Sequence, residues 1–166
     1  MFTVDSYISS IKSNLDKQSD LLVENLKKIL AYNFSVDINL LDFSAFIEPT
    51  RFELSIMMFS MDKEGNEVFY EGTDPTVFAG SAEVLSEIEY HSLADNQFND
   101  FFDFYEQNED TLVQEEQGTF TNWFKECWEK ADGQILDLPS YFGLHDDYNS
   151  FDLKGNQWID DEKKWS

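Results

Sequence analysis

The side chains that could carry chemistry in this chain are its carboxylates, two histidines and one cysteine. His91 and His145 lie far apart, and neither has a serine or cysteine motif beside it. No glycine-rich phosphate-binding loop is present either, so the pattern argues against nucleophilic and phosphoryl-transfer enzymes. Cys127 falls on the apolar side of a predicted helix, where a thiol is usually an inert small hydrophobe. The carboxylates are the remaining candidates.

A specific metal site is not predicted. A calcium-binding EF-hand loop needs oxygen ligands at alternate positions, a glycine at the sixth and a glutamate at the twelfth. Neither Asp62–Asn66 nor Asp146–Asn149 has this spacing, and one cysteine cannot build a cysteine-based zinc site. His145 beside Asp146 and Asp147 is the one mixed group, and a surface turn explains it more simply. We therefore expect no metal, no cofactor and no catalytic residue.

The distribution of charge is the most informative property of the sequence. The chain has 34 acidic and 11 basic residues, a formal net charge of −23, and no lysine or arginine between Lys63 and Lys125. That basic-free segment carries fifteen aspartates and glutamates. Soluble domains usually carry a net charge of roughly 2 to 8 in magnitude. So large an excess repels itself, which favours a role in the rapid capture of a positively charged target.

The composition also limits the fold and the compartment. With 42% hydrophobic and 16% aromatic residues, the chain is too apolar for a disordered acidic tail. We expect residues 1–166 to form a single α+β domain with one core. No signal sequence or membrane-spanning stretch is visible, and the only cysteine cannot form an internal disulfide, so a cytoplasmic protein without membrane contact is predicted.

Helical spacing dominates the beginning of the chain. It predicts a long amphipathic helix over Val4 to Phe34, or two helices with a break near Ser19 and Asp20. The apolar positions that carry this pattern are Val4, Ile8, Ile11, Leu15, Leu22, Leu26, Ile29 and Leu30.

The middle of the chain is predicted to be a sheet. Residues 52–59 alternate and then become apolar throughout, which is typical of a strand covered on both faces. Turn residues at 62–66 lead to 68–70, predicted as the second arm of a β-hairpin. Residues 82–90 fit a helix or a strand, and a third strand is slightly favoured because 72–80 already serves as a loop.

Two helices are predicted after Asp95. An aromatic stripe defines the first, and the second has Thr119 as its N-cap and Gly133 as its stop, with Thr111–Gly118 as a connection before it. The stripe consists of Phe98, Phe101, Phe102 and Tyr105. Leu136–Trp158 is predicted as a closing hairpin around a Lys154–Asn156 turn, followed by a charged tail. The expected sheet is small and antiparallel, with about three to five strands.

The predicted partner-binding site lies in the segment without basic residues. Phe104 lies off the aromatic stripe, which suggests an exposed anchor, although packing beneath a neighbouring loop is the alternative. The residues predicted to bind a partner are Asp100, Asp103, Phe104, Glu109, Asp110, Glu115 and Glu116, with Asp146 and Asp147 as a second patch.

In its general character the chain resembles the bacterial immunity proteins that neutralise toxins of contact-dependent and other polymorphic systems. No diagnostic motif carries this resemblance, so it assigns no residue a role. It implies a non-catalytic cytoplasmic inhibitor of a basic toxin domain, most simply a nuclease, without direct nucleic-acid binding. The alternatives are a DNA mimic, which would bind several unrelated DNA-binding proteins, and a carboxylate- or metal-dependent enzyme, which would show turnover or metal uptake.

Overall fold

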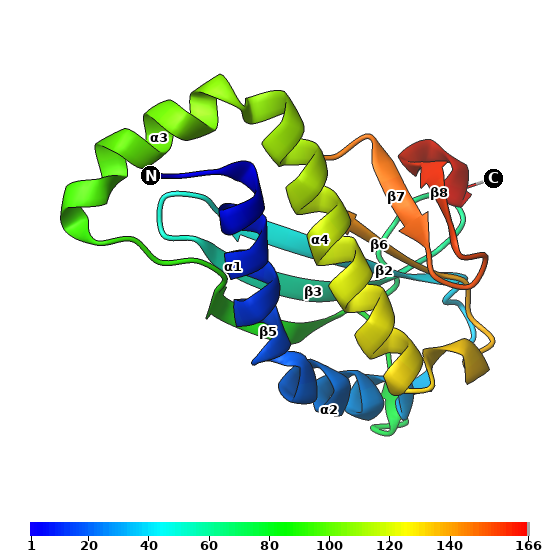
Figure 1. Cartoon of the computed structure of the whole chain (residues 1–166). Coiled ribbons are helices and arrows are strands. Elements are labelled where there is room, and N and C mark those ends of the chain that lie inside the picture. The colour runs from blue at the N-terminus through cyan, green and yellow to red at the C-terminus, as the bar shows by residue number, and fades with distance from the viewer. Residues whose placement is uncertain (166) are drawn as a thin grey trace.

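The sheet that organises this protein has the strand order β5-β3-β2-β6-β7-β8. In the computed structural model, which describes residues 1–165, β2 and β6 run parallel and the other neighbours antiparallel (Figure 1). The six strands are β2 (Leu40–Glu48), β3 (Glu53–Met61), β5 (Ser81–Glu89), β6 (Ser140–Leu144), β7 (Asn149–Asp152) and β8 (Gln157–Asp160). A separate parallel pair joins β1 (Asn33–Phe34) to β4 (Val77–Phe78). The predicted α+β class is confirmed. The prediction of a small antiparallel sheet of three to five strands is wrong, because the sheet has six strands and includes a parallel pair.

Two helices, rather than one long helix, open the chain. These are α1 (Val4–Asp16) and α2 (Ser19–Leu30), so the predicted alternative with a break near Ser19 is confirmed. The Thr3 side chain accepts a hydrogen bond from the Ser6 amide, and the Ser6 hydroxyl accepts one from the Thr3 amide. This reciprocal cap satisfies main-chain donors that have no partner within the helix.

The C-terminal half contributes α3 (Phe98–Gln107) and α4 (Glu109–Lys130), with short 3-10 helices η1 (Asp95–Gln97) and η2 (Gly133–Ile135). The prediction of Thr111–Gly118 as a connection is wrong because α4 runs through it. Buried Leu112 extends the apolar side of the helix to its first turn, and glutamate and glutamine favour helix. Thr119 is therefore no N-cap, and its hydroxyl donates to the Glu115 carbonyl at 2.6 Å.

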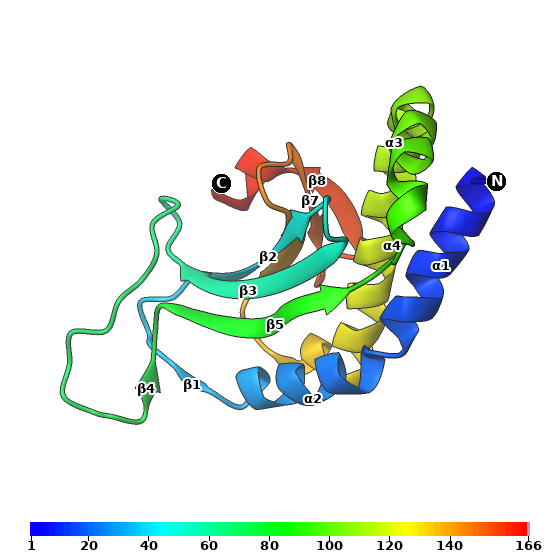
Figure 2. The ribbon, with the colours of Figure 1, turned by 90° about the vertical axis from the view of Figure 1, so that its left-hand side faces the viewer.

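The hairpin predicted between 52–59 and 68–70 is also wrong. The turn at 62–66 exists, but beyond it the chain makes only an isolated bridge, between Met61 and Glu67. The neighbours of β3 are β2 and β5, so the preference for a strand over 82–90 is confirmed. Residues 62–80 instead leave the six-stranded sheet as a long loop that contains the short strand β4 (Figure 2).

The closing hairpin is confirmed as β7 and β8 around Lys154–Asn156. Asp152 Oδ1 accepts hydrogen bonds from the Lys154 and Gly155 amides at 3.1 and 2.9 Å. Asn156 has a φ of 55°, a conformation that asparagine tolerates better than most residues. The predicted charged tail forms a 3-10 helix, η3 (Asp161–Trp165), in which Lys164 is buried.

The helices α1, α2 and α4 cover one face of the sheet (Figures 1 and 2). Along β3, Leu54, Ile56 and Met58 are fully buried, while Met57 and Phe59 on the opposite face are partly exposed. The buried positions join the helices in one hydrophobic core. None of the helices within residues 1–165 is long and apolar enough to cross a membrane.

Candidate functional site

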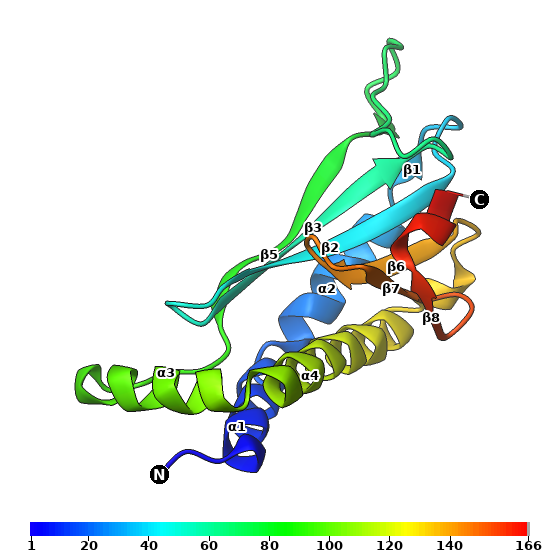
Figure 3. The same ribbon diagram turned by 90° about the horizontal axis from the view of Figure 1, so that it is seen from above.

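The predicted carboxylates gather on a projecting helical corner. We call residues 98–117, which are α3 and the first turns of α4, the acidic arm. Figures 1 and 3 show the start of α3 extending beyond the other helices; from there α3 runs toward the body of the protein and bends into α4. The exposed carboxylates of the arm are Asp100, Asp103, Glu106, Glu109, Asp110 and Glu115. Among residues 1–165 none of them forms an ion pair, so the arm presents uncompensated negative charge.

Glu116 does not belong to this exposed set, contrary to the prediction. Its carboxylate is partly buried and accepts hydrogen bonds from the Tyr7 hydroxyl at 2.6 Å and the Tyr105 hydroxyl at 2.5 Å. Burial raises the pKa of Glu116, and the two hydrogen bonds act in the opposite direction. The pKa of Tyr105 is raised by burial and by the neighbouring carboxylate. Glu116 therefore fixes the base of the arm to α1.

Phe104 is less exposed than expected for an anchor of a partner. Phe104 is partly buried, and its ring centre lies 5.9 Å from that of Phe2 and 6.0 Å from that of Phe101. The alternative, packing beneath a neighbouring loop, is met only in part, because Phe104 contacts Phe2 in the segment before α1 and also Phe101 of its own helix. Phe102, which was assigned to the buried stripe, is 40% exposed. The exposed aromatic ring of the arm is therefore Phe102 rather than Phe104. The apolar side of α3 is narrower than the sequence indicates, because it does not include Phe102.

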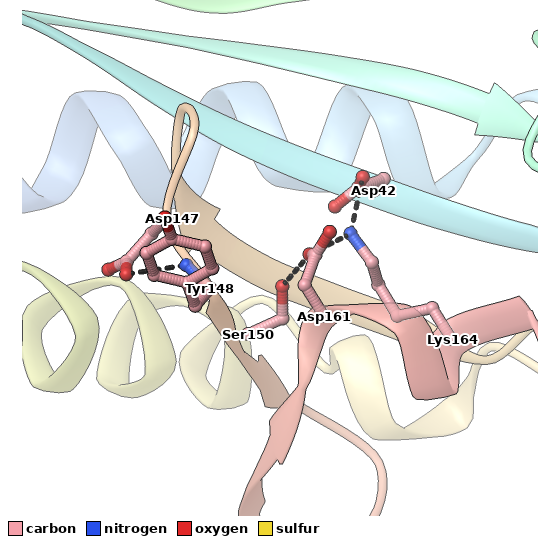
Figure 4. A network of polar contacts seen from close by, with 6 residues as sticks. All are labelled: Asp42, Asp147, Tyr148, Ser150, Asp161 and Lys164. Atoms are coloured by element: carbon pink, nitrogen blue, oxygen red, sulfur yellow. Dashed lines mark hydrogen bonds and ion pairs between the residues drawn. The ribbon is translucent and has the colours of Figure 1, made fainter.

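The second predicted patch lies next to the acidic arm. Asp147 is partly buried and accepts a hydrogen bond from the Gln117 side chain, which ties the turn between β6 and β7 to α4. Asp147 also accepts one from the Tyr148 amide at 2.7 Å (Figure 4). Asp146 is exposed, and its carboxylate lies 3.3 Å from His145 Nε2. The structure therefore places the second patch beside the α4 end of the acidic arm, with Asp146 as the more accessible of its two carboxylates.

His91 and Cys127 are both buried in the core. His91 is buried among Tyr7, Phe52 and Phe101, and Nδ1 lies 2.9 Å from the Ser10 hydroxyl. Burial lowers the pKa of His91 and raises that of Cys127, which favours the neutral form of each. Within residues 1–165 no group of three or more histidine, cysteine or acidic side chains is placed to hold a metal.

One ionic network was missed by sequence reasoning (Figure 4). Lys164 Nζ lies 2.9 Å from Asp42 Oδ2 and 2.6 Å from Asp161 Oδ1. Asp161 also accepts a hydrogen bond from the Ser150 hydroxyl at 2.6 Å. The available signal was Asp42, a charged residue within the apolar strand segment around Leu41. The network holds η3 against the sheet, so its role is to stabilise the fold.

The acidic arm is accordingly the best candidate for a functional surface, because its exposed carboxylates have no ion-pair partner among residues 1–165. No protein-family model, curated protein or solved structure matches this chain.

Proposed function

We propose that this protein is a non-catalytic inhibitor that binds a basic protein through the acidic arm. The favoured partner is a nuclease toxin, which would make the chain an immunity protein. A nuclease needs a cationic surface to hold the phosphate backbone, and an anionic protein that covers this surface blocks the substrate. The observation that carries the proposal is the set of six exposed, unpaired carboxylates on a projecting corner within residues 1–165.

The geometry favours capture by attraction over a distance. Charges exposed on a projecting element are not neutralised by neighbouring cations, so they accelerate the encounter with a positive surface. The attraction is screened over a Debye length of about 8 Å at physiological ionic strength. Association should therefore slow as the salt concentration rises, while dissociation changes less.

The test is affinity capture from a lysate of the source organism, followed by stopped-flow association of the purified pair at two salt concentrations. The Asp100→Lys/Asp103→Lys double variant should lower the association rate about ten-fold. The Glu126→Lys/Glu129→Lys variant is a matched control, because it makes the same charge change at the same spacing on the far half of α4. The captured protein should cleave nucleic acid, and this cleavage should stop when the present protein is added. Equal effects of the two variants, or undiminished cleavage, would count against the proposal.

A further inference from the structure

The strand β8 is an open edge of the sheet. The Asp161 amide donates to the Tyr148 carbonyl at 2.8 Å and so continues the ladder between β7 and β8. In an antiparallel pair, residues alternate between those that bond to the partner strand and those whose N–H and C=O point away. Because Asp161 bonds to β7, every second residue before it does the same, so the N–H and C=O groups of Ile159 point toward β7. The N–H groups of Trp158 and Asp160 point away from β7, toward the open edge. Within residues 1–165 no hydrogen bond covers the outward N–H and C=O of Trp158.

The opposite edge of the sheet is protected in ways that β8 is not. At β5, the Asn25 side chain of α2 donates to the Val84 carbonyl at 2.8 Å. The β5 ladder has register shifts, and Glu87 has a φ of 50°. A bulge and a covering helix both prevent the addition of another strand. The two edges therefore differ, and β8 is the one available for pairing.

A hollow of about 640 Å³ runs beside β8 on the helical side of the sheet. Trp158 lies in its lining, is 44% exposed, and packs edge-on against Phe151 with ring centres 5.4 Å apart. Gln114 and Gln117 of α4 form the other side. An incoming strand would find an aromatic surface for its apolar side chains and amides for its polar groups.

This edge is held in place before any partner arrives. The network of Asp42, Ser150, Asp161 and Lys164 anchors the end of β8 and the start of η3 to the sheet (Figure 4). A template that is already rigid loses little conformational freedom on binding.

We propose that β8 binds an extended segment of the basic protein partner as an added strand, with Trp158 as its apolar anchor. The inference rests on the proposed function for the identity of the partner. Unpaired N–H and C=O groups along a strand edge are complementary to another extended main chain. A second copy of this chain is disfavoured as the occupant because each copy carries a charge of −23. A segment with lysine or arginine is instead attracted by the net charge of the chain, and Asp160 in the lining of the hollow can meet one of its cations, although Lys163 lies in the same lining.

The experiment uses the full chain, labelled with ¹⁵N, and a short synthetic peptide that alternates lysine with valine. The control peptide has the same side chains but is N-methylated along its main chain, so it keeps the charge and loses the N–H donors. We expect the first peptide to slow amide exchange of Trp158 at least about ten-fold and the control to leave it unchanged. Trp158→Ala should weaken the first peptide about ten-fold. Equal effects of the two peptides would overturn the proposal.

A pair of variants tests the same point with the captured partner. Asp160→Pro removes an outward N–H at an edge position that tolerates proline, whereas Asp160→Ala removes only the carboxylate. We expect Asp160→Pro to raise the dissociation constant about ten-fold relative to Asp160→Ala. If the two variants bind alike while Asp100→Lys/Asp103→Lys still slows association, strand addition is wrong and the proposed function stands. If the charge reversal has no effect either, the proposed function fails as well.

Discussion

The Tyr7 hydroxyl donates a 2.6 Å hydrogen bond to Glu116 Oε2 and so joins α1 to α4 across 109 residues of sequence. Tyr105 of α3 donates to the other oxygen of the same carboxylate. One partly buried side chain thus connects α3 and α4, the two helices of the acidic arm, to α1. Aromatic packing supplements this polar connection, because Phe101 of α3 lies with its ring centre 5.2 Å from those of both Phe2 and Tyr7.

Replacing Glu116 with alanine should destabilise the protein. Two partly buried tyrosine hydroxyls would lose a charged acceptor, at a cost of about 3 kcal/mol in the free energy of unfolding. The neighbouring Glu115 is exposed, so Glu115→Ala should change that free energy by less than about 0.5 kcal/mol. Urea denaturation of the two variants checks the prediction, and equal midpoints would show that the tyrosine contacts add no stability.

The buried carboxylate also gives stability a defined pH dependence. Burial raises the pKa of Glu116 in the folded protein above its ordinary value of 4.5, so the folded state binds a proton more readily than the unfolded state. Glu116 therefore adds stability as pH falls through its folded pKa toward 4.5. His91 acts in the opposite sense: burial lowers its pKa below 6.5, so it removes stability as pH falls below 6.5.

Glu116→Gln separates these contributions. The melting temperature of the wild type minus that of the variant should rise as pH falls from 7 to 5, because only the wild type gains the Glu116 contribution. His91 and the general repulsion among carboxylates are common to both proteins and cancel. Thermal melts across this range provide the measurement, and a constant difference would mean that the pKa of Glu116 is not raised.

Three neighbouring aromatics of α3 should differ in their contribution to stability. Phe101 is fully buried, so Phe101→Ala should cost about 4 kcal/mol. Phe104 packs against Phe2 and Phe101 while partly exposed, and its replacement should cost about 2 kcal/mol. Phe102 is 40% exposed, so Phe102→Ala should lower the free energy of unfolding by less than about 1 kcal/mol. Denaturant unfolding of the alanine variants gives the order, and a larger loss for Phe102 than for Phe104 would reverse the assignment of the exposed ring.

The ion pair between Lys164 and Asp42 should be sensitive to the loss of one partner. Burial alone would lower the pKa of Lys164, but Asp42 and Asp161 raise it above its ordinary value, which keeps the ammonium charged. Lys164→Met leaves Asp42 without its cation and should cost about 3 to 5 kcal/mol. Lys63→Met, at an exposed position, should be near neutral. The single variants Lys164→Met and Asp42→Asn and the double variant Asp42→Asn/Lys164→Met form a double-mutant cycle. If the double variant loses as much free energy of unfolding as the two single variants together, Lys164 and Asp42 are not coupled.

Sequence reasoning succeeded where the pattern was local and regular. The helix break near Ser19, the strand over 82–90 and the hairpin around Lys154–Asn156 all follow from side-chain spacing and turn residues. It failed for 111–118, where a polar run was taken for a loop although glutamate and glutamine are good helix formers. It also failed for the second arm at 68–70, because a turn fixes the direction of the chain but not which strand becomes its neighbour.

The sequence alone determined the charge of the protein, the existence of the helices α1 to α4 and of the strands β3, β5, β7 and β8, and the presence of fifteen carboxylates in a segment without cations. These properties depend on composition and on neighbouring residues. Only the tertiary structure decided which carboxylates are exposed, that β2 and β6 pair, and that Lys164 reaches Asp42 across 122 residues. Such contacts join segments that are distant in the sequence. The periodicity of side chains depends only on local geometry, so it does not indicate which other segment a strand or helix contacts in the fold.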